Sequence, residues 1–288
     1  MSGQYHYLIA SLPEYAFDTD NARIDVPALR AEIKSEISRK DQLAVELLYT
    51  YYDIENVIIY LKGSKTPFNM LGNLDPAQIK AEVDGTTASE DDQVTVSLLP
   101  SDIRLAIDRH KGRIDLENQD PDEKPETVEI EHRLYSDFYK LCRRSHSKFL
   151  REWSDIDRII RNIITVSRAR SMGLDPDKMI IGNGPLEKQL LESQSADFGL
   201  KDDFRYTEDL LQVLETTDFV ARERKMDVLR WNIATELSQF DYFNISVILD
   251  YLIKLNILYR WESLDKQEGR DRFRLIVENL TEIDTDRD

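Results

Sequence analysis

Residues 127–172 read TVEIEHRLYSDFYKLCRRSHSKFLREWSDIDRIIRNIITVSRARSM and contain neither glycine nor proline. Apolar side chains recur through this stretch three or four positions apart, as at Leu134, Phe138 and Leu141. That spacing is the period of an amphipathic α-helix. One unbroken helix of this length would be unusually long. We therefore expect helix on both sides of a bend or short break near Ser145–Ser147.

The rest of the 288-residue chain has the same character, with only 10 glycines and 9 prolines to interrupt helices. A second long helix is expected over about 41–62, with Gly63 as its stop signal. Hydrophobic residues make up 41% of the chain and charged residues 32%, which is typical of a folded protein with a well-charged surface. The sequence predicts an all-α fold.

The charge and cysteine content limit the possible function classes. A net charge of −17 argues against nucleic-acid binding, because phosphate neutralisation needs a cationic surface. The single cysteine, Cys142, allows no internal disulfide and fits a reducing compartment. The N-terminus lacks the features of a signal peptide, and no stretch approaches the roughly 20 apolar residues that span a bilayer. We expect a cytoplasmic protein without direct membrane insertion.

An acidic segment with two prolines, 115–126, is the best candidate for a connector between parts of the chain. It separates an N-terminal helical repeat, 1–114, from a second helical repeat, 127–206. A third and more divergent helical repeat is expected over 207–288.

Two segments suggest that one design is used more than once. Asp53–Ile59 and Asp155–Ile160 each combine an aspartate with an aliphatic run late in a helix, after aromatic residues. Each helix is followed by the same triplet, Leu74–Pro76 in one copy and Leu174–Pro176 in the other, and each triplet is expected to start a short helix. Chance similarity between two amphipathic helices is the alternative. We interpret the two aspartates as hydrogen-bonding groups between packed helices rather than as ligands.

A search for catalytic and binding motifs finds none that is complete. Gly63–Thr66 has a glycine and a lysine, but it lacks the other glycine and the preceding strand of a phosphate-binding loop. Cys142 and His146 stand four positions apart without a third metal ligand nearby. Asp202 and Asp203 resemble the acidic pair of helical diphosphate enzymes, but the third acid is missing. We predict no catalytic, cofactor or metal site, and a protein that is not an enzyme.

The first copy of the repeated segment resembles the C subunit of V-type and archaeal-type ATPases, which is called subunit d in eukaryotes. That family closes a helix with an aspartate, an asparagine three positions later, an aliphatic stretch and a basic residue before glycine. Asp53, Asn56, Lys62 and Gly63 match this pattern. The opening Tyr5–Tyr7 is also similar to the family's N-terminus.

The later copies resemble the family less closely. The second keeps Asp155 but has Arg158 where asparagine is usual. The third is identified with Ile248–Leu252, which contains Tyr251 and lacks the glutamates that usually follow. The nearest likeness is to a divergent bacterial branch of unassigned function.

This resemblance implies a funnel-like array of repeated helical layers, located between the membrane rotor ring and the central stalk of a V-type ATPase. Such a subunit couples the proteolipid ring to the central-stalk subunits during proton or sodium transport and does no chemistry itself. It implies a subunit that is a monomer in the complex, cytoplasmic and peripheral to the inner membrane through that complex. A helical adaptor with another partner, or an all-helical enzyme, are the alternatives.

The segment Lys140–Arg170 has 9 basic and 3 acidic residues, whereas Asp84–Glu131 has 14 acidic and 5 basic residues. Two solvated helix faces of opposite sign, touching each other, would explain this asymmetry. The other interpretation is a basic surface for an acidic partner, with Arg143, Arg144 and Arg151 as candidate contacts.

Overall fold

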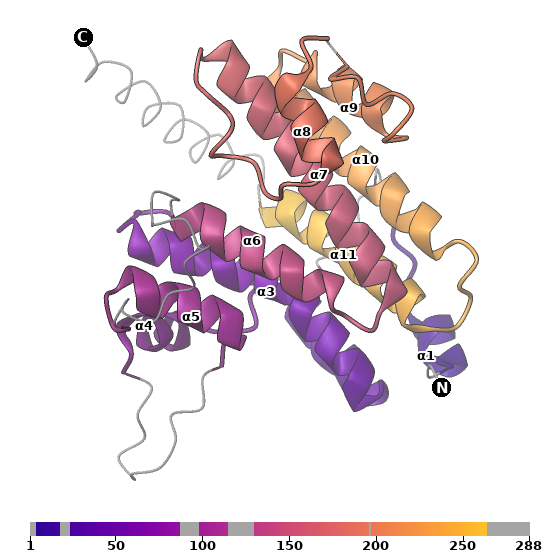
Figure 1. Ribbon diagram of the computed structural model, residues 1–288. Coiled ribbons are helices and arrows are strands. Elements are labelled where there is room, and N and C mark those ends of the chain that lie inside the picture. The colour runs from indigo at the N-terminus through magenta and orange to yellow at the C-terminus, as the bar shows by residue number, and fades with distance from the viewer. Residues whose placement is uncertain (1–3, 18–23, 87–97, 115–129, 196, 264–288) are drawn as a thin grey trace.

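The computed structural model describes residues 4–17, 24–86, 98–114, 130–195 and 197–263 (Figure 1). Within these ranges the chain forms 11 α-helices and no strand. The all-α prediction is confirmed. No described helix is both long enough and apolar enough to span a bilayer.

The helices are organised as three successive pairs, and in each pair the second helix follows the first after a short turn. The pairs are α2 (Val26–Glu36) with α3 (Arg39–Leu61), α6 (Ile130–Arg143) with α7 (Lys148–Ser171), and α10 (Phe219–Ser238) with α11 (Ile245–Ser263). Shorter helices lie before and between the pairs. They are α1 (His6–Ser11), α4 (Pro76–Asp84), α5 (Ser101–His110), α8 (Pro185–Glu192) and α9 (Thr207–Leu214).

Local capping explains where the long helices begin and end. The Ser38 side chain accepts the Asp41 N–H at the start of α3, and the Ser147 side chain accepts the Leu150 N–H at the start of α7. The second cap confirms the expected break in the glycine-free stretch, since α6 ends at Arg143 before it. Gly63, at a φ of +60°, turns the chain out of α3, as its position predicts.

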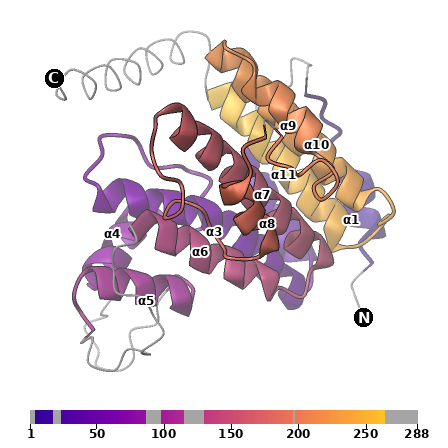
Figure 2. The ribbon, with the colours of Figure 1, turned by 45° about the horizontal axis from the view of Figure 1, so that its top comes forward.

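The hydrophobic core has three parts, and the long helices join them. Figure 2 shows α3 beside α6 and α10 beside α11. Residues of α2, α3 and α11 form one part, and α3 also packs with α4, α5 and α6 in the second. The third part lies between α7, α8, α9 and α10. Helix α7 contributes Phe149 and Leu150 to the first part and Ile160 and Ile163 to the third. Each long helix thus links neighbouring parts of the array.

The turns within the three pairs meet at one end of the molecule, where the N-terminal segment binds them together. Tyr5 donates its N–H to the Phe243 carbonyl in the α10–α11 turn at 2.7 Å and its hydroxyl to Asp41 at the start of α3. His146, in the α6–α7 turn, lies 3.2 Å from the other Asp41 oxygen. Asp41 is 3% exposed, so this polar contact is shielded from solvent.

The boundaries expected from the sequence fit this arrangement only in part. The connector 115–126 and the end of the third repeat, 264–288, lie outside the described residues. The expected second repeat ends at Tyr206, but α9 packs in the same core part as α7 and α8. Helix α9 therefore packs between the second and third pairs, as α5 packs between the first and second.

Candidate functional site

The loops that follow α3 and α7 are each held by one buried asparagine. Asn56 donates from Nδ2 to the Asn69 carbonyl at 2.9 Å, and its Oδ1 accepts the Asn69 N–H at 2.6 Å. Asn162 makes the same two bonds to the carbonyl and N–H of Ile181, both at 2.8 Å. We call this pair of bonds a backbone clamp. It pairs both the N–H and the C=O of one loop residue with a single side chain.

Two charged side chains reinforce the first clamped loop. Asp53 accepts the Leu74 N–H at 3.0 Å and the Asn73 side chain at 2.8 Å, and burial raises the pKa of this carboxyl group. Arg30, on α2, donates to the Leu71 carbonyl at 2.7 Å. Asp53 therefore has a structural role, as expected, although it holds a loop rather than a neighbouring helix.

Arg158 plays the corresponding part for the second clamped loop. Its guanidinium donates to the Ile181 carbonyl at 3.0 Å and forms a buried ion pair with Glu187. Glu187 in turn accepts the Gly184 N–H at 2.9 Å, which caps α8. The Arg158 side chain is only 9% exposed, so it belongs to the core of the repeat.

The register expected for the second copy differs from the structure. The Asp155 side chain is 50% exposed and pairs with Arg158 at 2.9 Å, unlike the buried Asp53. Asn162 is the residue that matches Asn56. Leu174–Pro176 is irregular, is followed by a turn at 177–179 and starts no helix, whereas Pro185 starts α8 as Pro76 starts α4. The aliphatic spacing repeats with every helical turn, so it cannot distinguish registers one turn apart.

The third copy shows the same difference. Tyr251, on α11, packs near Tyr15 with the ring centroids 6.3 Å apart, and it makes no backbone clamp. The asparagine of α11 is Asn256, one turn further along. A short sequence signal could have found it, because the second helix of each pair carries an asparagine followed by two aliphatic residues. The triplets are Asn56-Val57-Ile58, Asn162-Ile163-Ile164 and Asn256-Ile257-Leu258.

The basic residue that closes the first repeat joins two helix pairs. Lys62, directly after α3, lies 2.5 Å from Glu131 on α6. The Lys62 side chain is 53% exposed, so this pair contributes little to stability on its own.

The three arginines predicted as partner contacts lie near the α6–α7 turn. Arg143 and Arg144 have largely exposed side chains and form long surface pairs with Asp155 at 3.4 Å and Asp102 at 3.2 Å. Arg151 donates to the Ser145 carbonyl at 2.7 Å and so stabilises the turn itself. The Arg144–Asp102 pair joins the basic segment to the acidic one.

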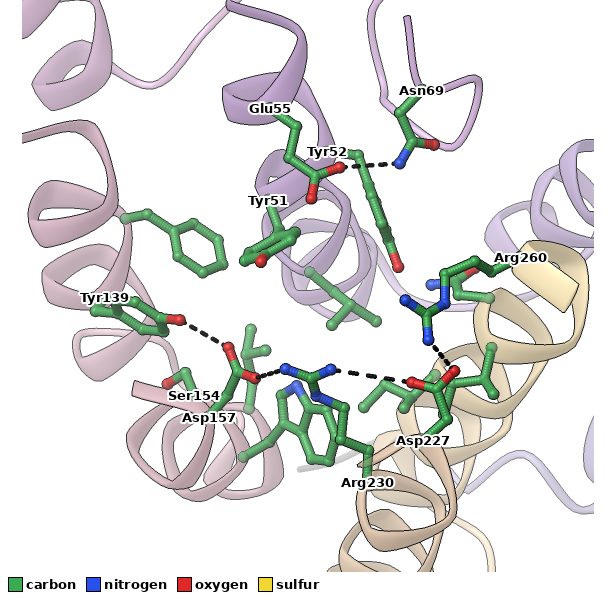
Figure 3. Close-up of a pocket in the computed structure, with 17 residues that line it drawn as sticks. Tyr51, Tyr52, Glu55, Asn69, Tyr139, Ser154, Asp157, Asp227, Arg230 and Arg260 are labelled. Carbon is green, nitrogen blue, oxygen red and sulfur yellow. Dashed lines mark hydrogen bonds and ion pairs between the residues drawn. The ribbon is translucent and has the colours of Figure 1, made fainter. Parts of the chain in front are cut away.

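A pocket of about 200 Å³ lies between α3, α6, α7, α10 and α11, which come from all three helix pairs (Figure 3). A chain of polar contacts crosses it. Tyr139 donates to Asp157 at 2.7 Å, and Arg230 lies between Asp157 at 3.3 Å and Asp227 at 3.9 Å. Arg260 completes the chain by pairing with Asp227. Burial lowers the pKa of Arg230, but Asp157 and Asp227 raise it further, so this guanidinium stays charged.

The other side of the pocket is lined by the aromatic face of α3 and by Asn256. Glu55 accepts a hydrogen bond from the Asn69 side chain at 2.9 Å, and burial raises the pKa of its carboxyl group. Burial also raises the pKa of Tyr51 to about 12, so its hydroxyl remains a neutral donor at physiological pH. The pocket therefore offers hydrogen-bond donors and acceptors to a small polar group.

The residues considered for metal binding do not come together. Cys142 is buried on α6, while His146 faces Asp41. Asp202 and Asp203 lie in the turn before α9. Among the described residues, no group of three or more histidine, cysteine, aspartate or glutamate side chains is placed to hold a metal ion.

A family model described as a protein of unknown function (DUF2764) matches residues 1–283. Comparison with the curated proteins and with the solved structures gives no match.

Proposed function

Since the chain belongs to the family of DUF2764 proteins, whose function is unknown, we propose its role from its repeated architecture: it is a non-catalytic coupling subunit of a V-type ATPase or ATP synthase. In this role it connects the proteolipid ring of the membrane to the central stalk. It acts as one copy, from the cytoplasmic face of the inner membrane, during proton or sodium transport.

The observation that supports this proposal is the threefold use of one structural unit. Three helix pairs surround a common pocket, and the second helix of each pair has an asparagine in the same triplet. Repeated helical layers around a centre are what the resemblance to the ATPase C subunit implies. We propose that these layers form the funnel-like array of such a subunit.

The mechanical properties of the unit suit a part that transmits torque. The clamps hold the loops after α3 and α7 to the helices before them. The long helices link the parts of the core. A rotation applied at one end of such an array is transmitted to the other, because densely packed interiors deform little.

A subunit that connects the proteolipid ring to the central stalk needs a separate binding surface for each of them. Exposed aromatic side chains gather near α1 and the α10–α11 turn, where Tyr7, Phe240 and Tyr242 are each more than two-thirds exposed. Arg143 and Arg144 provide exposed positive charge near the α6–α7 turn. We propose these arginines as contacts to an acidic surface of the complex.

Affinity purification from solubilised membranes tests the proposal. A tagged full-length chain should recover proteolipid and central-stalk subunits together. The variant with Arg143→Glu and Arg144→Glu should recover them less well, whereas the variant with Lys178→Glu and Lys188→Glu, which places the same charge change on a different surface, should behave like the wild type.

Recovery of neither set of subunits, from membranes in which the ATPase is intact, would overturn the proposal. Recovery of a different, specific partner would instead support a helical adaptor. A gene located within a V-type ATPase operon provides an independent check.

A further inference from the structure

Exposed aromatic side chains gather at the end of the molecule where the turns of the three helix pairs meet. Within the described parts of the chain, the three most exposed large hydrophobic side chains are Tyr7 at 94%, Phe240 at 80% and Tyr242 at 69%. Tyr7 lies on α1 and the other two in the α10–α11 turn, and the His6 ring packs on the Phe243 ring between them, with the centroids 3.9 Å apart (Figure 1). Apolar side chains gathered on a surface in this way indicate a binding site.

The same end of the molecule is basic, although the chain as a whole is strongly acidic. The three turns with their flanking residues, 36–43, 143–152 and 239–244, contain six basic and four acidic residues, whereas the net charge of the chain is −17. One of the four acidic residues, Asp41, is buried. The Lys148 side chain at the start of α7 is 75% exposed. This end therefore offers aromatic rings and positive charge together.

We propose that this basic and aromatic end binds the surface of an anionic lipid bilayer. Aromatic rings are favourable at the level of the lipid headgroups, where one side of the ring is apolar and the other is hydrated. Lysine and arginine side chains beside them are attracted by anionic headgroups. A second copy of the chain would instead bring two basic ends together, which like charges disfavour.

The charge of the rest of the chain determines the orientation on the bilayer. The three turns account for +2 of the net charge of −17, so the remainder carries −19. An anionic surface repels that remainder, so the basic and aromatic end is the part that faces the membrane. The inference is independent of the coupling role, because it requires no subunit of the ATPase.

Sedimentation of the full-length protein with lipid vesicles tests this proposal. The wild type should sediment with vesicles that contain phosphatidylcholine and phosphatidylglycerol, and at least about tenfold less well with vesicles of phosphatidylcholine alone. Binding should also weaken as the salt concentration is raised from about 0.1 M to about 0.5 M, because salt screens the exposed charges. These vesicles contain no ATPase subunit, so a failure here leaves the coupling role standing.

Substitution of the exposed rings tests the aromatic contribution. The variant with Phe240→Ser and Tyr242→Ser should bind the anionic vesicles roughly tenfold or more weakly than the wild type. The variant with Met70→Ser and Met179→Ser is the matched control, because these side chains are 62% and 45% exposed in the loops after α3 and α7. It should bind like the wild type. Both variants change exposed side chains and should keep the wild-type urea midpoint.

Substitution of exposed lysines tests the charge contribution. The variant with Lys40→Glu and Lys148→Glu should also bind the anionic vesicles roughly tenfold or more weakly, and it leaves the arginines of the proposed coupling contact unchanged. The variant with Lys178→Glu and Lys188→Glu makes the same charge change away from the three turns. It should bind like the wild type.

The proposal is wrong if the wild type binds anionic and neutral vesicles equally or binds neither. It is also wrong if the variant at Phe240 and Tyr242 binds as tightly as the wild type. A photo-reactive phenylalanine analogue in place of Phe240, activated in intact cells, distinguishes the occupants of this surface. A cross-link to phospholipid supports the proposal, and one to a second copy or to an acidic protein contradicts it.

Discussion

The Tyr49 hydroxyl donates a hydrogen bond to the Asn256 side-chain oxygen at 2.9 Å and thereby connects α3 of the first helix pair to α11 of the third. Both residues are buried, and they are distant in the sequence. This contact closes the ring of three pairs, since α3 packs with α6, α6 with α7, and α7 with α11.

Replacing Tyr49 by phenylalanine removes only this hydroxyl. We expect the free energy of unfolding to fall by about 1–2 kcal/mol, because the buried Asn256 oxygen loses its partner. Urea denaturation followed by circular dichroism measures the change. Tyr7→Phe is the matched control, because Tyr7 is 94% exposed, and it should leave stability unchanged. Equal effects of the two substitutions would contradict the role of the contact.

Asn162→Asp tests the second backbone clamp. The carboxylate still accepts the Ile181 N–H, but it places a negative oxygen against the Ile181 carbonyl instead of a donor. We expect a loss of about 2–4 kcal/mol in unfolding free energy. Asn183→Asp makes the same chemical change at an exposed site of the same loop and should cost less than about 0.5 kcal/mol. If Asn162→Asp left the free energy of unfolding unchanged, the clamp would add nothing to stability.

Gly72→Ala tests the close approach of the first loop to α3. A Cβ atom at this position would lie 2.7 Å from the Asp53 carboxylate and 3.2 Å from the Asn56 amide. We expect a loss of about 1–3 kcal/mol from this overlap. In a double-mutant cycle, Asp53→Ala should relieve part of the Gly72→Ala cost, since it removes the obstructing group. Simple additivity of the two losses would exclude this contact as the cause.

The contact of Asp41 with Tyr5, Ser38 and His146 predicts a dependence of stability on acid pH. Burial raises the pKa of Asp41, but hydrogen bonds from these three side chains lower it further, to a value below the usual 3.8. In the unfolded chain the carboxyl group therefore takes up its proton first. The contribution of Asp41 is fully present above that usual value and is lost as the pH falls through the lower, folded value.

Asp41→Asn should make the free energy of unfolding less steep between about pH 5 and pH 2, because the titrating group is gone. Denaturation curves of the wild type and the variant across this range measure the difference. Identical slopes would show that Asp41 does not contribute to acid unfolding.

Much of the helical structure could be predicted because its signals are local. The scarcity of glycine and proline, the helical spacing of apolar residues and the Ser147 cap all act within a few turns. The register of the repeat could not be obtained in this way. A match between Asp53 and Asp155 keeps the aliphatic spacing but misplaces the asparagine, whose partner lies in a loop of variable length.

The central pocket could not be predicted for a different reason. Tyr139, Asp157, Arg230 and Arg260 come from helices of the second and third pairs and meet only after the pairs have packed. No spacing in the sequence connects these residues. Charges that form a buried ion pair and charges that lie on solvated helix faces have the same sequence pattern, so the sequence does not distinguish them.

The bond from the Tyr5 N–H to the Phe243 carbonyl has a consequence for how the chain is made. Synthesis proceeds from the N-terminus, and the first helix pairs can pack while later residues are still being added. Tyr5 is synthesised long before the α10–α11 turn, so it forms this bond only after that turn has emerged from the ribosome. This contact therefore forms only late in synthesis, and a bulky group placed close to Tyr5 would interfere with it at that stage.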